Sequence, residues 1–288
     1  MRAETEVTPM KEIFMRFPGG LGKTLTFSYD DAVWEDIRLM DIFKQHRLKA
    51  TFNINSGLFA PEGTTQPADR IGGQMPRSLV RELYAHELFE VASHSVDHPF
   101  LTNVADAVAL GQVVYDRRRL EELFGRPIRG MAYPMGPYND RVVELCRMAG
   151  VHYARTVVST YRFDLPEEWL TLHPTCHHAD PRLTALADTF LTMSVRRFPQ
   201  MFYVWGHSYE FHRDDNWHII EDFAARMAGK EDIWYATNDE ICRYCHSYAR
   251  LRWSADGEMM YNPTAIDLWY AREGGAAAVI RSGETVRL

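Results

Sequence analysis

Hydrophobic positions along the chain recur with two alternating spacings. Short runs rich in β-branched and aromatic residues, such as residues 24–29, are followed by longer stretches in which apolar residues recur three and four positions apart, such as residues 34–46. This pattern predicts strands over residues 24–29, 50–54, 89–93, 130–133, 152–158, 171–175, 201–205 and 233–237. It predicts helices over residues 34–46, 77–85, 103–125, 139–149, 183–194, 217–228 and 240–249.

The alternation of strands and helices predicts an α/β fold with a parallel sheet. With seven or eight strands, a closed or nearly closed (β/α) barrel is favoured over an open sheet. We expect this barrel to cover residues 24–250, after an N-terminal β extension over residues 1–23. From residue 251 onward the apolar segments are short and alternating, which predicts a small β appendage packed on the barrel over residues 251–288.

Charge and composition exclude several classes of protein. The 32 Lys and Arg residues are outnumbered by 39 Asp and Glu residues, the opposite of the balance expected in a protein that binds nucleic acid. The longest apolar runs have five residues, whereas a membrane helix needs about 20. The charged N-terminus and four scattered cysteines predict an intracellular, cytoplasmic protein without disulfide bonds. The sequence does not exclude that the protein forms a homo-oligomer.

Polar residues gather where the predicted strands end, which is where barrels carry their chemistry. Asp30 and Asp31 end the first barrel strand, and two adjacent carboxylates need a cation or a proton; a helix cap at Asp31 is the alternative. His94 and His98 follow the third barrel strand, and one turn of chain would let both reach one cation. Two imidazoles and one carboxylate leave positions open for water, as in a catalytic metal site.

A further histidine, His207, ends the strand at residues 201–205 and would face the same site. An imidazole that titrates near neutrality suits a proton donor. Because a nearby dication would depress the pKa of His207, we expect a carboxylate or carbonyl to hold its other ring nitrogen.

Four segments in this order resemble the polysaccharide deacetylase family, the family 4 carbohydrate esterases with a NodB-like domain. They are Phe27-Ser-Tyr-Asp-Asp31, His94-Ser-Val-Asp-His98, Met131-Ala-Tyr-Pro-Met-Gly136 and Trp205-Gly-His207. The resemblance covers roughly residues 24–245. It implies a distorted (β/α) barrel and a hydrolase of carbon–nitrogen bonds that removes an N-acetyl group from an acetylated amino sugar or polysaccharide with metal-activated water.

The resemblance also assigns roles by position. Asp31, His94 and His98 would bind one divalent metal ion, usually Zn²⁺, with Co²⁺, Ni²⁺ or Mn²⁺ as alternatives. Asp30 would be the general base and His207 the general acid that protonates the departing amine. The backbone N–H of Met135 would help to hold the oxyanion.

The chain departs from the family pattern at three positions. Ala132 stands where the family commonly has an Arg that orients the catalytic Asp, and Met135 replaces a Tyr. Arg155, at the end of the next strand, could supply the missing cation, or could be a surface salt-bridge residue. Trp205 replaces a Leu, so the wall beside the acetyl methyl group would be bulkier.

Three other residues are candidates for supporting the site or contacting substrate. They are Tyr133, His177 and His178; plain loop positions are the alternative for the two histidines. Metal ligation by His177 is not expected, because three better-spaced ligands are present.

Other functions remain open at this level. The missing signal peptide favours an intracellular, allantoinase-like amidohydrolase that acts on a small non-sugar amide or ureide. An iron(II) oxygenase also fits two His and one carboxylate, but the second Asp argues against it. A non-catalytic carbohydrate-binding relative is disfavoured because Asp30 and His207 are both retained.

Overall fold

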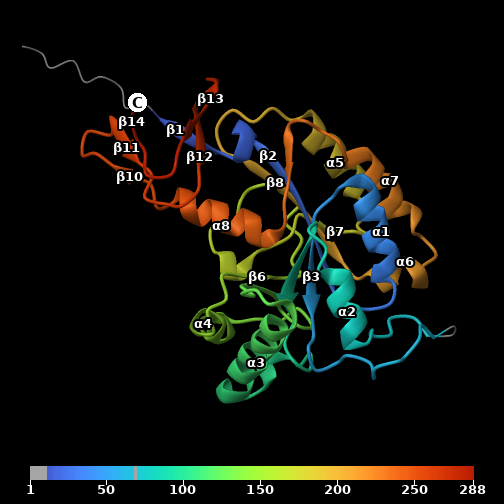
Figure 1. Cartoon of the computed structure of the whole chain (residues 1–288). Coiled ribbons are helices and arrows are strands. Elements are labelled where there is room, and N and C mark those ends of the chain that lie inside the picture. Colours follow the sequence, from blue (N-terminus) through green and yellow to red (C-terminus); the bar gives the residue numbers. More distant parts are fainter. Residues whose placement is uncertain (1–11, 68–69) are drawn as a thin grey trace, which may run out of the picture.

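A curled parallel sheet forms the centre of the molecule (Figure 1). The computed structural model describes residues 12–67 and 70–288. The strands are β2 (Lys23–Asp30), β3 (Ala50–Ile54), β4 (Phe89–Ser93), β5 (Gly130–Ala132), β6 (Tyr153–Arg155), β7 (Cys176–His177), β8 (Gln200–Gly206) and β9 (Ile233–Tyr235). Their order is β6-β5-β4-β3-β2-β8-β7, with β9 also paired to β2, and all these pairs are parallel. The predicted distorted α/β barrel is thereby confirmed.

The two edges of this sheet are joined by the segment that leads into β7. The N–H of Leu172 donates to the carbonyl of Ala154, and the N–H of Thr156 donates to the carbonyl of Leu172. The same segment then pairs with β8 as β7. The strand predicted over residues 171–175 is therefore wrong in detail, since regular pairing begins only at Cys176. Pro174 has no N–H with which to continue a ladder.

Eight α-helices lie in the described part of the chain. They are α1 (Asp36–His46), α2 (Arg77–Tyr84), α3 (Asp106–Phe124), α4 (Asp140–Met148), α5 (Leu183–Thr192), α6 (Ser208–Arg213), α7 (His218–Met227) and α8 (Asn238–Tyr248). Three short 3₁₀ turns are η1 (Pro18–Gly20), η2 (Leu101–Asn103) and η3 (Trp169–Thr171). In Figure 1, α1, α5, α6 and α7 cover one side of the sheet, while α3 and α4 lie together beyond β4–β6.

Local signals explain several helix ends. The side chain of Asn139 accepts a hydrogen bond from the N–H of Val142 and so caps α4. Gly125 closes α3 in the left-handed conformation, with φ 66°. Asn103, expected to start α3, instead ends η2, and α3 begins at Asp106. The six-residue helix α6 was not predicted, because it is too short to display a helical period.

The chain ends outside the barrel form two small antiparallel sheets. One has the order β1-β12-β13 and joins β1 (Ile13–Arg16) to β12 (Leu268–Arg272) and β13 (Ala277–Ile280). The other has the order β10-β11-β14, from Arg252–Trp253, Met259–Tyr261 and Thr285–Arg287. Their apolar residues share one core cluster with the α8 residues Ile241 and Tyr244, so these sheets rest on α8.

Side chains of the barrel strands alternate between an apolar outer layer and a polar interior. In β2, Leu25, Phe27 and Tyr29 pack in the main hydrophobic cluster with residues of α1 and α7. The intervening β2 residues are polar and also fully buried: Thr24, Thr26, Ser28 and Asp30. They hydrogen-bond inside the barrel; the hydroxyl of Thr26 donates to Asn238 (2.8 Å), and Asn53 donates to Ser28 (2.8 Å). The helices thus supply the apolar core, and the interior is free to hold polar groups.

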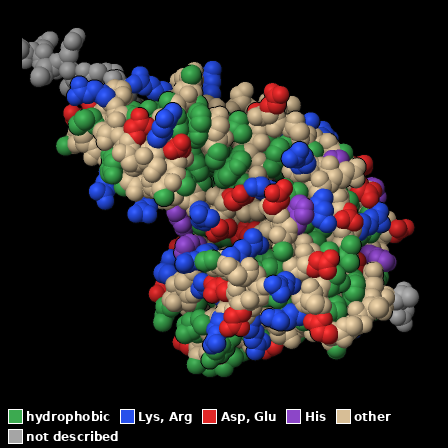
Figure 2. Space-filling view, viewed as in Figure 1, with side chains coloured by type: hydrophobic (Ala, Val, Ile, Leu, Met, Phe, Trp, Pro, Cys, Tyr) green, Lys and Arg blue, Asp and Glu red, His purple; other side chains and the backbone are tan. Residues whose placement is uncertain are grey.

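A buried carboxyl lies near the beginning of β4, at the end of the barrel remote from Asp30. Glu90 accepts hydrogen bonds from the side chains of Thr51 (2.8 Å) and Tyr153 (2.5 Å) and from the N–H of Asp239 (2.9 Å). It lines a cavity of about 570 Å³ with charged residues of both signs, among them Arg129. Figure 2 shows charged side chains gathered in a hollow across the middle of the molecule. Burial, reinforced by Asp239, raises the pKa of Glu90 to about 7 despite these hydrogen bonds.

We expect Glu90 to make folding stability depend on pH. Its pKa is about 7 in the fold against an ordinary 4.5, so its stabilising contribution is complete below 4.5 and is lost as pH rises through 7. At about 1.4 kcal/mol per pKa unit, the Glu90 contribution should fall by about 2 kcal/mol between about pH 5 and pH 8. Urea unfolding of the wild type and of Glu90→Gln at both pH values measures it. An equal pH dependence in both proteins would contradict the assignment.

Candidate metal centre and proton-transfer groups

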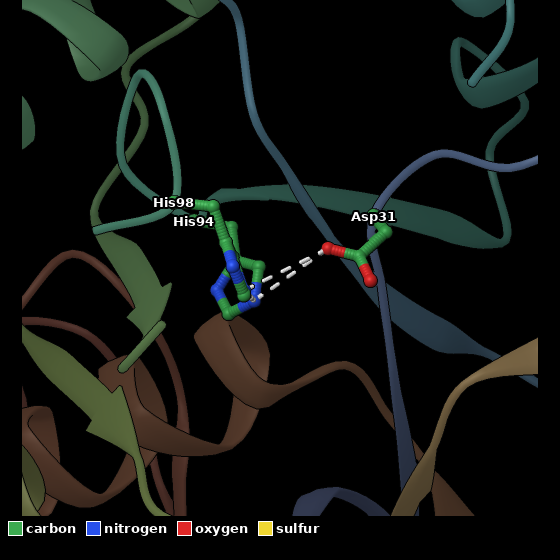
Figure 3. Close-up of side chains that lie close together, drawn as sticks. All are labelled: Asp31, His94 and His98. Carbon is green, nitrogen blue, oxygen red and sulfur yellow. Dashed lines mark hydrogen bonds and ion pairs between the residues drawn. The ribbon is translucent and has the colours of Figure 1, made fainter. Parts of the chain in front are cut away.

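Asp31, His94 and His98 form a compact group at the carboxyl end of the sheet (Figure 3). The Nε2 atoms of His94 and His98 lie 3.0 Å apart, and each lies 3.9 Å from Oδ1 of Asp31. His94 is buried, whereas the side chains of Asp31 and His98 keep 18% and 20% of their exposure. One face of the group is therefore open to solvent.

The ring of His94 is oriented by the next strand. Its Nδ1 lies 2.9 Å from the carbonyl oxygen of Ala132, and because a carbonyl only accepts, Nδ1 carries the proton and donates. This leaves Nε2 as the lone-pair nitrogen facing Asp31 and His98, the tautomer that a metal ligand requires. Burial lowers the pKa of His94, although the charges of Asp30 and Asp31 oppose the shift. The imidazole is thus neutral and ready to bind a cation.

Buried polar side chains hold the His94 loop through hydrogen bonds. The carboxylate of Asp116 accepts hydrogen bonds from the hydroxyl of Ser93 (2.5 Å) and from the N–H of His94 (3.2 Å). The side-chain amide of Asn55 donates to the carbonyl of Ser95 (3.0 Å). These bonds satisfy the loop backbone in a region that water does not reach.

Several residues in the predicted site segments have backbone conformations that L-residues rarely adopt. The φ angles are 81° for Asp31, 64° for Ser95, 55° for His98 and 60° for Met135. Each such residue costs of order 1–3 kcal/mol, a cost that proteins tend to retain at functional sites. At His98 the following Pro99 already disfavours the α conformation. Asp31 does not cap a helix, because α1 begins at Asp36 and its N-cap residue is Glu35.

Asp30 lies next to the Asp31, His94 and His98 group, and two donors hydrogen-bond to its carboxylate. Nη2 of Arg155 donates to its Oδ2 at 2.5 Å, and the side-chain amide of Asn53 donates to its Oδ1 at 2.8 Å. Oδ2 also lies 3.8 Å from Nε2 of His94 and 3.6 Å from Nε2 of His207. Burial alone would raise the pKa of Asp30, but Arg155 and the two histidines lower it below the ordinary value. Asp30 is therefore an ionised carboxylate in a buried position.

Arg155 lies inside the barrel, not on the surface. Its side chain is 1% exposed, and its guanidinium stacks 4.4 Å from the ring centre of Trp205. Trp205 is itself 8% exposed and contacts the ring of His207, 5.8 Å away between ring centres. The indole thus packs against both the guanidinium of Arg155 and the ring of His207.

His207 has a carboxylate on each side of its ring. Nε2 faces Asp30, and Nδ1 lies 3.5 Å from Oε2 of Glu210. Burial would lower the pKa of His207, but hydrogen bonding to Glu210 and the charges of Asp30 and Asp31 raise it overall. Glu210 is thus the carboxylate expected behind His207. Sequence reasoning did not identify this residue, although the spacing His207-x-x-Glu210 at a helix start is that of a capping box.

The two neighbouring histidines also converge on Glu210. Nε2 of His177 lies 3.0 Å from Oε2 of Glu210, and Nε2 of His178 lies 3.4 Å from the same atom. His178 is 1% exposed and packs against the rings of Tyr29 and Phe211, so its side chain belongs to the aromatic core beside the site. Gly206 is required beside it, because a Cβ there would lie 2.0 Å from Nδ1 of His178.

The loop after β5 holds the remaining predicted residues. Met135 lies in a turn in which the N–H of Gly136 donates to the carbonyl of Tyr133 (3.1 Å), and its side chain is 53% exposed. The N–H of Tyr133 donates to the carbonyl of Arg155 at 3.0 Å, so its backbone contacts a residue of the site, whereas its side chain lies in the core. Its ring is buried against Tyr138, and its hydroxyl donates to the carbonyl of Leu170 at 2.8 Å, so it belongs to the core around α3 and α4.

The class of protein follows from the fold and the site together. A curled parallel α/β barrel carries a two-histidine, one-aspartate group at its strand ends, with an ionised carboxylate and a proton-bearing imidazole beside it. Groups of these kinds can bind a cation and can accept or donate a proton, which is the chemistry that hydrolases use. Within residues 12–67 and 70–288, no helix combines the length and the apolar character needed to cross a membrane.

Comparison with known proteins identifies the family. Residues 19–154, just under half of the chain, match the family model described as polysaccharide deacetylase. The resemblance predicted from the motifs is confirmed for this part of the chain. Polysaccharide deacetylases hydrolyse carbon–nitrogen bonds, so the predicted class of enzyme is confirmed at family level. No curated protein matches the chain in sequence.

Solved structures share the fold at low sequence identity. A Mycobacterium smegmatis protein assigned as a polysaccharide deacetylase is 14% identical, with a TM-score of 0.56, over 82% of this chain and 94% of that chain. A family 4 carbohydrate esterase from Streptomyces lividans in complex with acetate is 14% identical, with a TM-score of 0.47, over 74% and 91%. The Streptococcus pyogenes deacetylase PplD in complex with acetate is 18% identical, with a TM-score of 0.42. That match covers 51% of this chain and 61% of the S. pyogenes chain.

We expect one tightly bound divalent ion per chain, held by Asp31, His94 and His98. Elemental analysis after mild purification should find it in the wild type and should find it lost in His94→Ala and in His98→Gln. The control is His173→Ala, because His173 lies outside this group and contacts Thr156. Equal metal content in the wild type and in both ligand variants would exclude this site.

Proposed function

We propose that the chain is a metal-dependent hydrolase that removes an N-acetyl group from an acetylated amino sugar or polysaccharide. One observation carries the proposal. A carboxylate with a lowered pKa, Asp30, and an imidazole with a raised pKa, His207, lie 3.6 Å apart beside the Asp31, His94 and His98 group. Amide hydrolysis needs this division, with one group poised to accept a proton and the other poised to donate one.

The donor set supports a divalent ion such as Zn²⁺. Ligand atoms in a tetrahedral site with bonds of about 2.0–2.1 Å lie about 3.3 Å apart. The 3.0 and 3.9 Å separations among His94, His98 and Asp31 bracket that spacing, and His94 already presents its free nitrogen. A bound ion would polarise the amide carbonyl and lower the pKa of water.

Asp30 is the proton acceptor in this proposal. Its Oδ2 faces both His94 and His207, so it borders the space in which the amide and the attacking water would meet. Arg155 and Asn53 fix the carboxylate from the other side, and Arg155 keeps it ionised. In this role Arg155 replaces the cation that Ala132 cannot provide.

His207 is the proton donor. An amine leaves poorly unless it is protonated as the carbon–nitrogen bond breaks, and the imidazolium of His207 is favoured by Asp30 and Glu210. Met135, whose N–H lies on the strained loop after β5, would help to hold the oxyanion. Trp205 would border the acetyl methyl group.

Asp30→Asn should retain the divalent ion and lose most turnover. The amide is nearly isosteric but cannot accept a proton, and loss of a general base typically lowers the rate by about 10²–10⁴. The measurement is kcat on acetylated amino sugars and, in parallel, on small cyclic amides, with metal content determined on the same samples. Turnover near that of the wild type would exclude Asp30 as the base.

Replacing His207 with Ala should affect amides far more than activated esters. The amine leaving group of an amide needs a proton, whereas the leaving group of an aryl acetate does not. The same variant should be assayed on an acetamide substrate and on an aryl acetate, and the loss of kcat/KM compared with that of the wild type. Equal losses on both substrates would instead make His207 a positioning or oxyanion residue.

A further inference from the structure

A second group of possible metal ligands lies on the other side of His207. His177, His207 and Glu210 each offer one ligand atom, and these atoms lie within 4.8 Å of one another. Nε2 of His177 lies 3.0 Å from Oε2 of Glu210, and Nδ1 of His207 lies 3.5 Å from that oxygen. The group is distinct from the first one, because it uses Nδ1 of His207 while Nε2 of the same ring faces Asp30.

The spacing in this group suits a divalent ion as well as the first group does. The 3.0 and 3.5 Å separations lie on either side of the roughly 3.3 Å expected between ligands of a tetrahedral zinc ion. Two imidazoles and one carboxylate are a common zinc ligand set, and they leave one position for water. The first and second groups therefore have the same composition, and all ligand atoms of the second group lie within 4.8 Å of one another.

The group is both accessible and fixed in place. The side chains of His177, His207 and Glu210 keep 25%, 21% and 16% of their exposure, so an ion can enter from solvent. His177 ends β7, and the N–H of Ala179 donates to its Nδ1 at 3.2 Å, so the neutral ring carries its proton on Nε2, which faces Glu210. His178 supports Glu210 from the buried side, with its Nε2 3.4 Å away.

We propose that His177, His207 and Glu210 bind a second divalent ion, zinc being the best fit, when zinc exceeds one equivalent. On binding, the ion takes the place of the proton on Nδ1 of His207, and that proton passes to solvent. The ring proton of His177 moves from Nε2 to Nδ1 through solvent, and the contact with the N–H of Ala179 is given up. A ring whose Nδ1 holds a metal can no longer be an imidazolium. If His207 is the acid of the proposed deacetylation, on which this consequence rests, the second ion inhibits the enzyme.

Zinc binding alone tests the site without reference to activity. Metal-free wild type should be titrated with Zn²⁺, and the bound metal counted by elemental analysis and by calorimetry. We expect two equivalents, the second weaker than the first. His177→Gln should bind one equivalent, with the second weakened by at least the roughly 10–100-fold that loss of a supporting contact alone costs. Glu210→Gln repeats the test if His177→Gln does not fold.

Two further variants separate this site from the first one. His98→Gln should lose the tight equivalent and keep the one that depends on His177. His173→Gln changes a histidine that contacts Thr156 and belongs to neither group, so it should bind two equivalents. A single equivalent in the wild type at saturating zinc, or a second equivalent in His177→Gln that binds as tightly as that of the wild type, would overturn the second site. Neither result bears on the proposed deacetylation, which is tested by Asp30→Asn.

Inhibition tests the functional consequence. The deacetylation rate of the wild type should fall as the second equivalent fills. Inhibition of His177→Gln, relative to its own rate with one equivalent, should require at least about tenfold more free zinc. Filling of the second site in the wild type without loss of rate would overturn the inhibitory role.

Discussion

The contact between Asp30 and Arg155 organises the barrel interior. Asp30 ends β2 and Arg155 ends β6, strands that are separated by β3, β4 and β5 in the sheet order. A 2.5 Å bond between them can form only if the sheet curls until these strands face one another across the interior. The backbone bonds of Leu172 to β6 join the edges of the same sheet. Closure of the barrel and the position of Asp30 therefore depend on the same curl of the sheet.

A buried ion pair contributes little to stability by itself, because desolvation offsets the attraction. Removing one partner is costly, since it leaves an uncompensated charge in the interior. The apolar outer layer formed by residues such as Phe27, Phe43 and Phe223 stabilises the fold and supports the polar interior. The polar residues of the interior thus form the site, while the apolar residues of the outer layer stabilise the fold.

The sequence predicts those site residues that end strands, because strand ends meet at one edge of a parallel sheet. Asp30, Asp31, His94 and His207 are brought together in this way, and the turn after His94 adds His98. The contact made by Arg155 could not be decided from the sequence, because it depends on how far the sheet curls across four strands. The position of the Tyr133 side chain depends on a related point. Neighbouring positions of a strand face opposite sides, and the hydroxyl of Tyr133 faces the core.

Glu210 could have been found from its spacing to His207, but its importance depends on tertiary structure. The strand β7 brings His177 and His178 beside α6, so three imidazoles share the single carboxylate of Glu210. Burial lowers the pKa of His178 well below its ordinary value, so this ring stays neutral.

Burial likewise lowers the pKa of His94 on the other side of the site. His207 is different, because it lies between two carboxylates and its pKa is raised. Among His94, His178 and His207, only His207 has a raised pKa, and it is the ring that faces both Asp30 and Glu210. The ring of His207 has Nε2 toward Asp30 and Nδ1 toward Glu210. It therefore belongs both to the pair with Asp30 and to the second group of ligands.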